Sequence, residues 1–205
     1  MILQRPFAAL TPTLDGDVLF VLARADATFT GGELARLIPH ASQDGVRKAT
    51  KRLVAQGVVT MERVGRAFTY RLNREHLLTH AIVGISRANE MLRERVVAQV
   101  ERWARAPEAV LLFGSAARGE MHLGSDLDLL VIAEHDDATE EDVHALATAV
   151  TAWTGNDARL VHLSLEEVRN AWKAGDAFMD ELLDDGRVLY GPERLLHQVR
   201  REVAP

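Results

Sequence analysis

Apolar positions recur at helical spacing through the first part of the chain and then change to alternation. The segment "DVLFVLARA" (17–25) predicts a short apolar helix. Thr30 followed by Glu33 is typical of a capping box at the start of a second helix. A third helix is predicted from an N-cap at Ser42 to a C-terminal Gly57. "VVTMERVGRAFTYRL" then alternates around Val64-Gly65-Arg66, which predicts a β-hairpin.

From Asn73, a good N-cap residue, the pattern is helical for about thirty residues. Gly84 is the expected point of a break or bend. This segment either connects two modules or pairs with a second copy of the chain. Further on, "AVLLF" (109–113) and "DLDLLVI" (126–132) predict buried strands, and "DARLVHLS" (157–164) predicts a third. The remaining segments are helical, so the second half predicts an α/β domain.

Composition is ordinary for a folded chain of 205 residues, with 47% apolar and 26% charged residues. The absence of cysteine excludes disulfides and thiolate metal sites. No apolar run approaches the length of about 18 residues that a membrane span needs, and the N-terminus lacks the pattern of a secretion signal. We therefore expect a cytoplasmic protein without a membrane partner.

The net charge of −6 is unevenly distributed. Residues 1–80 hold eleven Lys and Arg against seven Asp and Glu, whereas residues 81–205 hold thirteen against twenty-three. A basic N-terminal part and an acidic C-terminal part favour two modules with different partners. The alternative is charge scatter between two halves of one domain.

Three short helices followed by a hairpin resemble a winged helix-turn-helix domain over roughly residues 14 to 72. In that family the second helix of the helix-turn-helix pair enters the major groove of DNA, and the hairpin is the wing. The resemblance implies DNA contacts from cationic and polar side chains of that helix and of the wing. These candidates are Gln43, Arg47, Lys48, Lys51, Arg52 and Arg66. The alternatives are a solvated amphipathic helix and a module for protein interaction.

Two aspartates occupy the second predicted strand of the C-terminal module. Asp126 and Asp128 are two positions apart, so on a strand both carboxylates point to the same side. Unpaired, they would repel each other and lose hydration, and a divalent cation such as Mg²⁺ resolves that conflict. Gly114 and Ser115 precede them at a turn where backbone N–H groups and a hydroxyl suit phosphate, and Arg118 follows one helical turn later.

Gly114-Ser115, ten intervening residues and then Asp126-Leu127-Asp128 resemble the signature of nucleotidyltransferases of the DNA polymerase beta superfamily. The stretch "FGSAARGEMHLGSDLDLLV" is similar to the minimal and antibiotic nucleotidyltransferases. The resemblance implies that Asp126 and Asp128 are catalytic and hold Mg²⁺ or Mn²⁺. It also implies a nucleotide site made of Gly114, Ser115, Arg118 and Ser125, with ATP as the expected substrate. A third acidic residue that many members carry on the next core strand corresponds here to Arg159.

The predicted fold class is α/β (α+β), in three parts. These are a winged helix-turn-helix over residues 1–75, a linker helix over 76–92, and a nucleotidyltransferase domain with a small mixed sheet flanked by helices over 93–205. We interpret His162 as a structural or surface histidine and Trp172 and Phe178 as core residues, with a wall for the nucleotide base as the alternative role of the two aromatic residues. The acidic residues Asp180, Glu181, Asp184 and Asp185 are interpreted as a solvated helix face.

The predicted function is transfer of a nucleoside monophosphate from an NTP to an acceptor, guided by DNA or a partner. Minimal nucleotidyltransferases often act as antitoxins that modify a toxin, so a protein acceptor fits the resemblance. A homodimer remains a candidate assembly. The alternative is a DNA-binding transcriptional regulator or antitoxin whose transferase fold is a degenerate nucleotide sensor, which Arg159 would permit.

Overall fold

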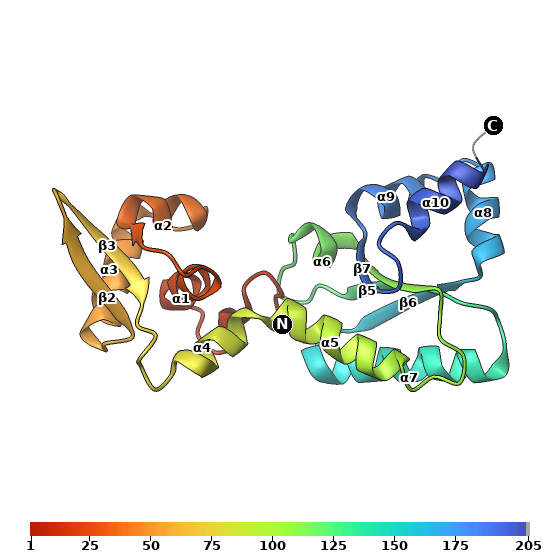
Figure 1. Cartoon of the computed structure of the whole chain (residues 1–205), viewed down its shortest axis with the longest axis horizontal. Coiled ribbons are helices and arrows are strands. Elements are labelled where there is room, and N and C mark those ends of the chain that lie inside the picture. Colours follow the sequence, from red (N-terminus) through yellow and green to blue (C-terminus); the bar gives the residue numbers. More distant parts are fainter. Residues whose placement is uncertain (204–205) are drawn as a thin grey trace. The chain divides into compact units, whose positions relative to one another are not determined.

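The computed structural model describes residues 1–203 and forms two compact units (Figure 1). The N-terminal unit contains residues 4–88, and the C-terminal unit begins at Asn89, with the first three residues divided between them. Within the described residues, no helix combines the length and apolarity that crossing a membrane requires. Each unit has its own sheet.

Four α-helices, a short 3₁₀ helix and a three-stranded sheet make up the N-terminal unit. The elements are η1 (Pro6–Ala9), α1 (Leu14–Arg24), β1 (Phe29–Thr30), α2 (Gly31–Leu37), α3 (Gln43–Ala55), β2 (Val59–Val64), β3 (Ala67–Leu72) and α4 (Thr79–Ser86). The strands lie in the order β1-β3-β2, and both pairs are antiparallel. The three helices and the hairpin predicted from the sequence are confirmed.

Local sequence signals account for where these elements begin and end. The predicted capping box forms at α2, where Glu33 N–H donates to Thr30 Oγ1 at 3.3 Å and Thr30 N–H donates to Glu33 Oε2 at 2.7 Å. Ser42 Oγ caps α3 by accepting from the N–H of Gly45 at 3.1 Å. The pairing of Val64 with Ala67 leaves a two-residue turn between β2 and β3.

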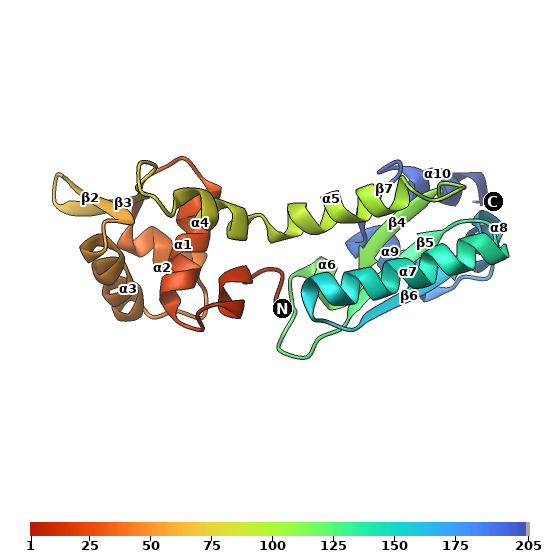
Figure 2. The same ribbon diagram turned by 90° about the horizontal axis from the view of Figure 1, so that it is seen from below.

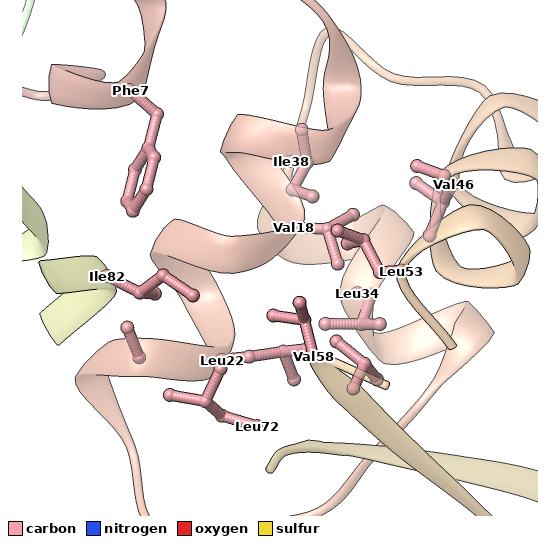
Figure 3. Close-up of a cluster of buried hydrophobic side chains, with 13 residues drawn as sticks. Phe7, Val18, Leu22, Leu34, Ile38, Val46, Leu53, Val58, Leu72 and Ile82 are labelled. Carbon is pink, nitrogen blue, oxygen red and sulfur yellow. The ribbon is translucent and has the colours of Figure 1, made fainter. Parts of the chain in front are cut away.

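Apolar side chains from every helix and from the two long strands form the core of this unit (Figure 3). Val18 and Leu22 of α1, Leu34 of α2 and Val46 of α3 are completely buried. Leu72 at the end of β3 and Ile82 of α4 join the same cluster. The hairpin and α4 are therefore held to the helices by a shared apolar core.

The helical segment predicted from Asn73 begins later than expected and is divided into two helices. The Asn73 side chain donates to Gly57 O at 2.8 Å and accepts from Glu75 N–H at 3.1 Å, which stabilises a turn instead. The helix begins at Thr79, whose hydroxyl donates to Asn73 O at 2.6 Å. The break also differs, because Gly84 lies inside α4 and the helix ends at Ser86.

The C-terminal unit is a four-stranded mixed sheet with helices on both faces. Its elements are α5 (Ala88–Val100), β4 (Ala109–Phe113), α6 (Gly114–Arg118), β5 (Leu127–Ile132), α7 (Asp137–Thr154), β6 (Ala158–Leu163), α8 (Leu165–Lys173), α9 (Ala177–Asp185), β7 (Arg187–Tyr190) and α10 (Leu195–Val203). The strand order is β6-β5-β4-β7, with β5 parallel to β6 and the other pairs antiparallel. The predicted small mixed sheet flanked by helices is confirmed.

Side chains along β5 point alternately to the two faces of the sheet, and each face is covered by its own layer of helices. Helices α5 and α7 lie on one face of the sheet, and α8, α9 and α10 lie on the other (Figures 1 and 2). Leu130 and Ile132 pack with Val168 and Leu182, so they face the layer of α8 to α10. Asp128 shares their parity on the strand and therefore points to this second face.

The two aromatic residues assigned to the core lie in this layer. Phe178 packs edge-on against Phe113, with 5.2 Å between ring centroids and an interplanar angle of 74°. Trp172 packs against the same buried cluster. The core interpretation of both residues is confirmed.

Truncation of Leu34 tests the N-terminal core. The side chain is fully buried, so Leu34→Ala should lower the free energy of unfolding of this unit by about 2–5 kcal/mol. The matched control is Leu37→Ala on the same helix, whose side chain is 54% exposed and whose loss should cost about 0.5 kcal/mol or less. Urea unfolding followed by circular dichroism measures both, and equal losses would contradict the assigned core.

Candidate active site

The turn between β4 and α6 brings backbone directly against a carboxylate. Phe113 is the register partner of Asp128 across the antiparallel β4–β5 pair, so Gly114 begins α6 beside that aspartate. Gly114 has φ +64°, and a Cβ placed on it would lie 2.7 Å from Asp128 Oδ2. Glycine is required here both by the left-handed backbone and by the lack of space.

Asp126 and Asp128 converge at the start of β5, as the sequence predicts. Asp126 lies one residue before the strand with its side chain 29% exposed, and Asp128 is the second residue of the strand. Burial raises the pKa of Asp128, and the negative charges of Asp126 and Glu181 raise it further, against the opposing charges of Arg159 and Arg118. The fold therefore disfavours a bare negative charge on Asp128.

Arg159 occupies the neighbouring position on the next strand. It is the register partner of Asp128 in the parallel β5–β6 pair. Its Nη2 lies 2.8 Å from Asp126 Oδ2, and its Nε lies 3.9 Å from Asp157 Oδ2. The side chain is 66% exposed, so solvent screens this ion pair and the arginine is free to move away. A cation thus stands beside the two carboxylates.

Arg118 is held by three carboxylates. Its Nε lies 3.0 Å from Glu120 Oε2, and its Nη1 lies 2.8 Å from Glu181 Oε1 and 3.5 Å from Asp185 Oδ2. These partners raise the pKa of the guanidinium, led by Glu120. The acidic face of α9 is exposed as predicted, with the Glu181 side chain 46% and the Asp185 side chain 38% exposed, but these two residues also pair with Arg118.

Glu181 is the functional candidate that the sequence did not reveal. Its charge reaches Asp128 strongly enough to raise the pKa of that residue, and it comes from α9, far along the chain. The signal available in the sequence was the spacing of Glu181 and Asp185, which places both on one side of a helix. Nothing in the sequence states which cation that side meets.

The two serines of the predicted nucleotide site have different surroundings. Ser115 is half-buried in α6, and its carbonyl accepts from Glu120 N–H at 2.9 Å. Ser125 is 8% exposed, and its hydroxyl accepts from His122 N–H at 2.9 Å. Ser125 O also accepts from Asn156 Nδ2 at 2.8 Å. Ser125 therefore shapes the loop that delivers Asp126 to the strand.

The predicted DNA-binding residues lie on one helix and one turn of the N-terminal unit. Gln43 begins α3, Arg47, Lys48, Lys51 and Arg52 follow on it, all exposed, and Arg66 lies in the hairpin turn. Acidic residues already pair with three of these cations. Asp44 lies 2.6 Å from Arg47 Nη2 and 2.8 Å from Lys48 Nζ, and Asp15 accepts from Arg52 Nε at 3.0 Å. The positive charge offered by α3 is smaller than its sequence suggests.

Comparison with known families identifies the part of the chain that carries the aspartates. Residues 98–194 match the family model described as Polymerase beta, Nucleotidyltransferase. No curated protein matches the sequence significantly.

Solved structures with similarity to this chain each cover 54% of it. One is described as a toxin-antitoxin with AMP-PNP, with a TM-score of 0.41, 19% identity and 82% of that chain covered. Two others are mutants of the toxin-antitoxin MntA-HpeT, at TM-scores of 0.41 and 0.39, identities of 18% and 20%, and coverage of 82% and 80% of those chains. The family match supports a nucleotidyltransferase domain of the polymerase beta type over residues 98–194, which include both aspartates.

Proposed function

We propose that the chain is a Mg²⁺-dependent nucleotidyltransferase that moves a nucleoside monophosphate from ATP to a hydroxyl group and releases pyrophosphate. The observation that carries the proposal is the placement of Asp128 against the backbone of Gly114, with the charge of Asp126 acting on Asp128 from the start of the same strand. We further propose that the acceptor is a protein, such as the toxin partner of an antitoxin. The family match over residues 98–194 supports the reaction class.

The two aspartates fit a hard divalent cation. Both offer carboxylate oxygens, which Mg²⁺ and Mn²⁺ prefer, and the raised pKa of Asp128 reflects a site where added positive charge is favourable. When bound, the cation would offset the charge of the triphosphate and of the departing pyrophosphate. Arg159 competes with it for Asp126 and has to swing away, which its exposure allows.

Residues around the aspartates would position the nucleotide. Gly114 lets backbone approach the phosphates without a side chain in the way, and Ser115 adds a hydroxyl. Arg118 reaches a phosphate only by exchanging Glu181 or Asp185 for it. That exchange would release Glu181, whose negative charge also acts on Asp128.

The ion pair between Arg159 and Asp126 favours one alternative. A cation fixed at the position of the third carboxylate supplies charge neutralisation without a second metal ion, which suits binding of a nucleotide more than its turnover. In that case the chain is a DNA-binding regulator or antitoxin that senses a nucleotide. Nucleotide binding without transfer to any acceptor would distinguish this alternative from the enzyme.

We propose that the N-terminal unit is a winged helix-turn-helix that binds DNA and guides the transferase domain. The support is the succession of three helices and a hairpin, with exposed cations on α3 and in the hairpin turn. Asp44 and Asp15 weaken that support because they pair with three of the cations on α3. A protein-interaction module remains the alternative for this unit.

Replacing Asp128 tests the transfer reaction. With ATP labelled in its α-phosphate and a candidate acceptor, Asp128→Asn should lower label transfer at least about 100-fold, because the metal-binding carboxylate supplies several kcal/mol of charge stabilisation. The matched control is Asp142→Asn on α7, which should transfer normally. Thermal unfolding checks the fold, and the Asn variant should be as stable as the parent or slightly more so, since burial disfavours the lost charge. Full transfer by Asp128→Asn would remove the proposed site.

Removing the competing cation should strengthen metal binding. Arg159→Ala should raise the affinity for Mn²⁺, measured by electron paramagnetic resonance, by up to about 5-fold, because an exposed ion pair is worth about 1 kcal/mol or less. Arg169→Ala on α8, which loses a comparable exposed ion pair with Glu202, should leave the affinity unchanged. Unchanged or weaker Mn²⁺ binding by Arg159→Ala would show that Arg159 does not oppose the metal.

Salt dependence tests the DNA proposal. Binding to genomic fragments should weaken as salt rises, and Lys51→Ala should flatten the slope of log K against log[salt] by about 0.9. Asp44→Asn should instead tighten binding, because it releases Arg47 and Lys48. Asp180→Asn in the other unit serves as the charge-matched control. Absence of DNA binding at about 50 mM salt, a condition that favours phosphate contacts, would move the unit to the protein-interaction class.

A further inference from the structure

Two histidines and two glutamates gather at the end of β5 opposite to the aspartates. His135 lies in the loop after β5, Glu140 in the first turn of α7, and His162 on β6. One ligand atom from each of these three residues lies within 4.8 Å of the other two. His162 belongs to the alternate set of β6 residues from Arg159, so it faces α7 and takes no part in the candidate active site.

Both ring nitrogens of His162 face oxygen atoms that can only accept a hydrogen bond in their usual charge state. Its Nε2 lies 3.2 Å from the carbonyl oxygen of Ala133, which only accepts, so Nε2 carries the hydrogen. In the neutral ring Nδ1 then holds a lone pair, and it lies 3.1 Å from Glu140 Oε1. Two acceptors need a proton or a metal ion between them. The His162 side chain is only 8% exposed, whereas Glu140 reaches the gap from an exposed position, so the cluster lies at the surface with one buried ligand.

His135 repeats this arrangement from the other side. Its Nε2 lies 2.7 Å from Glu167 Oε2, and its Nδ1 lies 3.1 Å from the same Glu140 Oε1 that faces His162. The two imidazole rings are 4.2 Å apart between centroids. Both Nδ1 atoms therefore converge on one carboxylate oxygen, while each Nε2 is held by an acceptor behind it.

An acceptor behind each ring is the usual support of metal-bound histidines. Such ligands donate their other N–H to a carboxylate or a backbone carbonyl, which fixes the tautomer and the ring orientation. Here Glu167 supports His135, and Ala133 O supports His162. Exposed acidic residues often gather without binding any ion, but they do not bring two supported imidazoles to one point.

We propose that His135, Glu140 and His162 bind Zn²⁺ through the two Nδ1 atoms and one carboxylate oxygen. Imidazole nitrogen suits Zn²⁺, whereas Mg²⁺ prefers oxygen ligands, so the site selects a different metal from the two aspartates. Three protein ligands leave the fourth tetrahedral position to water. Bound Zn²⁺ would tie the loop after β5 to β6 and to the start of α7, and Glu167 extends the connection to α8.

Direct titration tests the site. The untagged full-length chain, stripped with a chelator and titrated with Zn²⁺ by calorimetry, should bind one ion per chain and release protons. The proton release follows because Zn²⁺ takes the place of the protons that otherwise lie between the two Nδ1 atoms and Glu140 Oε1. Co²⁺ in place of Zn²⁺ should give the visible spectrum of a tetrahedral site.

Variants identify the ligands. Glu140→Gln and His135→Ala should each weaken Zn²⁺ binding at least about 10-fold, while the exposed neighbours Glu141→Gln and His144→Ala on α7 should bind as the parent does. Glu167→Gln keeps a residue able to form the capping box with Ser164, yet it loses the charge behind His135 and should weaken binding by about 10-fold. These positions avoid the buried His162, whose loss endangers folding.

No saturable Zn²⁺ binding, or equal binding by Glu140→Gln, His135→Ala and the parent, would overturn the proposal and leave a cluster held together by protons. Asp128→Asn should bind Zn²⁺ normally, because Asp128 lies at the other end of β5. Its defect in nucleotide transfer and a defect in Zn²⁺ binding are therefore separable.

Discussion

The contact between the carboxylate of Asp128 and the backbone of Gly114 fixes the geometry of the candidate active site. The β4–β5 register places Asp128 beside the end of β4, and the chain can turn into α6 there only with a glycine. A Cβ at position 114 would come within 2.7 Å of the carboxylate, and φ there is +64°. Any other residue would strain the left-handed backbone and would have to displace the Asp128 carboxylate.

Holding Asp126 and Asp128 together is electrostatically unfavourable, and the surrounding charges show how the fold manages it. Arg159 opposes the two negative charges from β6, whereas Glu181 adds to them from α9. Arg118 also opposes the negative charge on Asp128 and forms ion pairs with Glu120 and Glu181. A nucleotide with its cation would rearrange this network as a whole, because each cation released from one carboxylate becomes available to a phosphate.

Local signals in the sequence predicted the elements and the aspartate pair, since caps, turns and strand alternation depend on neighbouring residues. Thr30 with Glu33 and the turn at Gly65 formed as expected. The prediction failed where a contact with a residue far away in the sequence determines the local structure. Asn73 makes a turn rather than a cap because its amide group finds Gly57 O, and the role of Glu181 depends on α9 packing near α6. Neither contact can be inferred from the spacing of neighbouring residues in the sequence.

Strand β5 separates two sites of different chemistry. At its start two carboxylates meet backbone and arginine, and past its end two imidazoles meet one carboxylate. His162 and Arg159 are the register partners of Val131 and Asp128 and lie three residues apart on β6, or about 10 Å at a rise of about 3.3 Å per residue, which is too far for one ion to serve both sets. Donor chemistry then sorts the ions: oxygen ligands alone favour Mg²⁺, and imidazole favours Zn²⁺. In a chain without cysteine, histidines are the strongest ligands available for such a second metal. If both proposals hold, the β5–β6 pair would carry a reactive end and a structural end, and a metal ion bound at the second would help to hold the aspartates in register at the first.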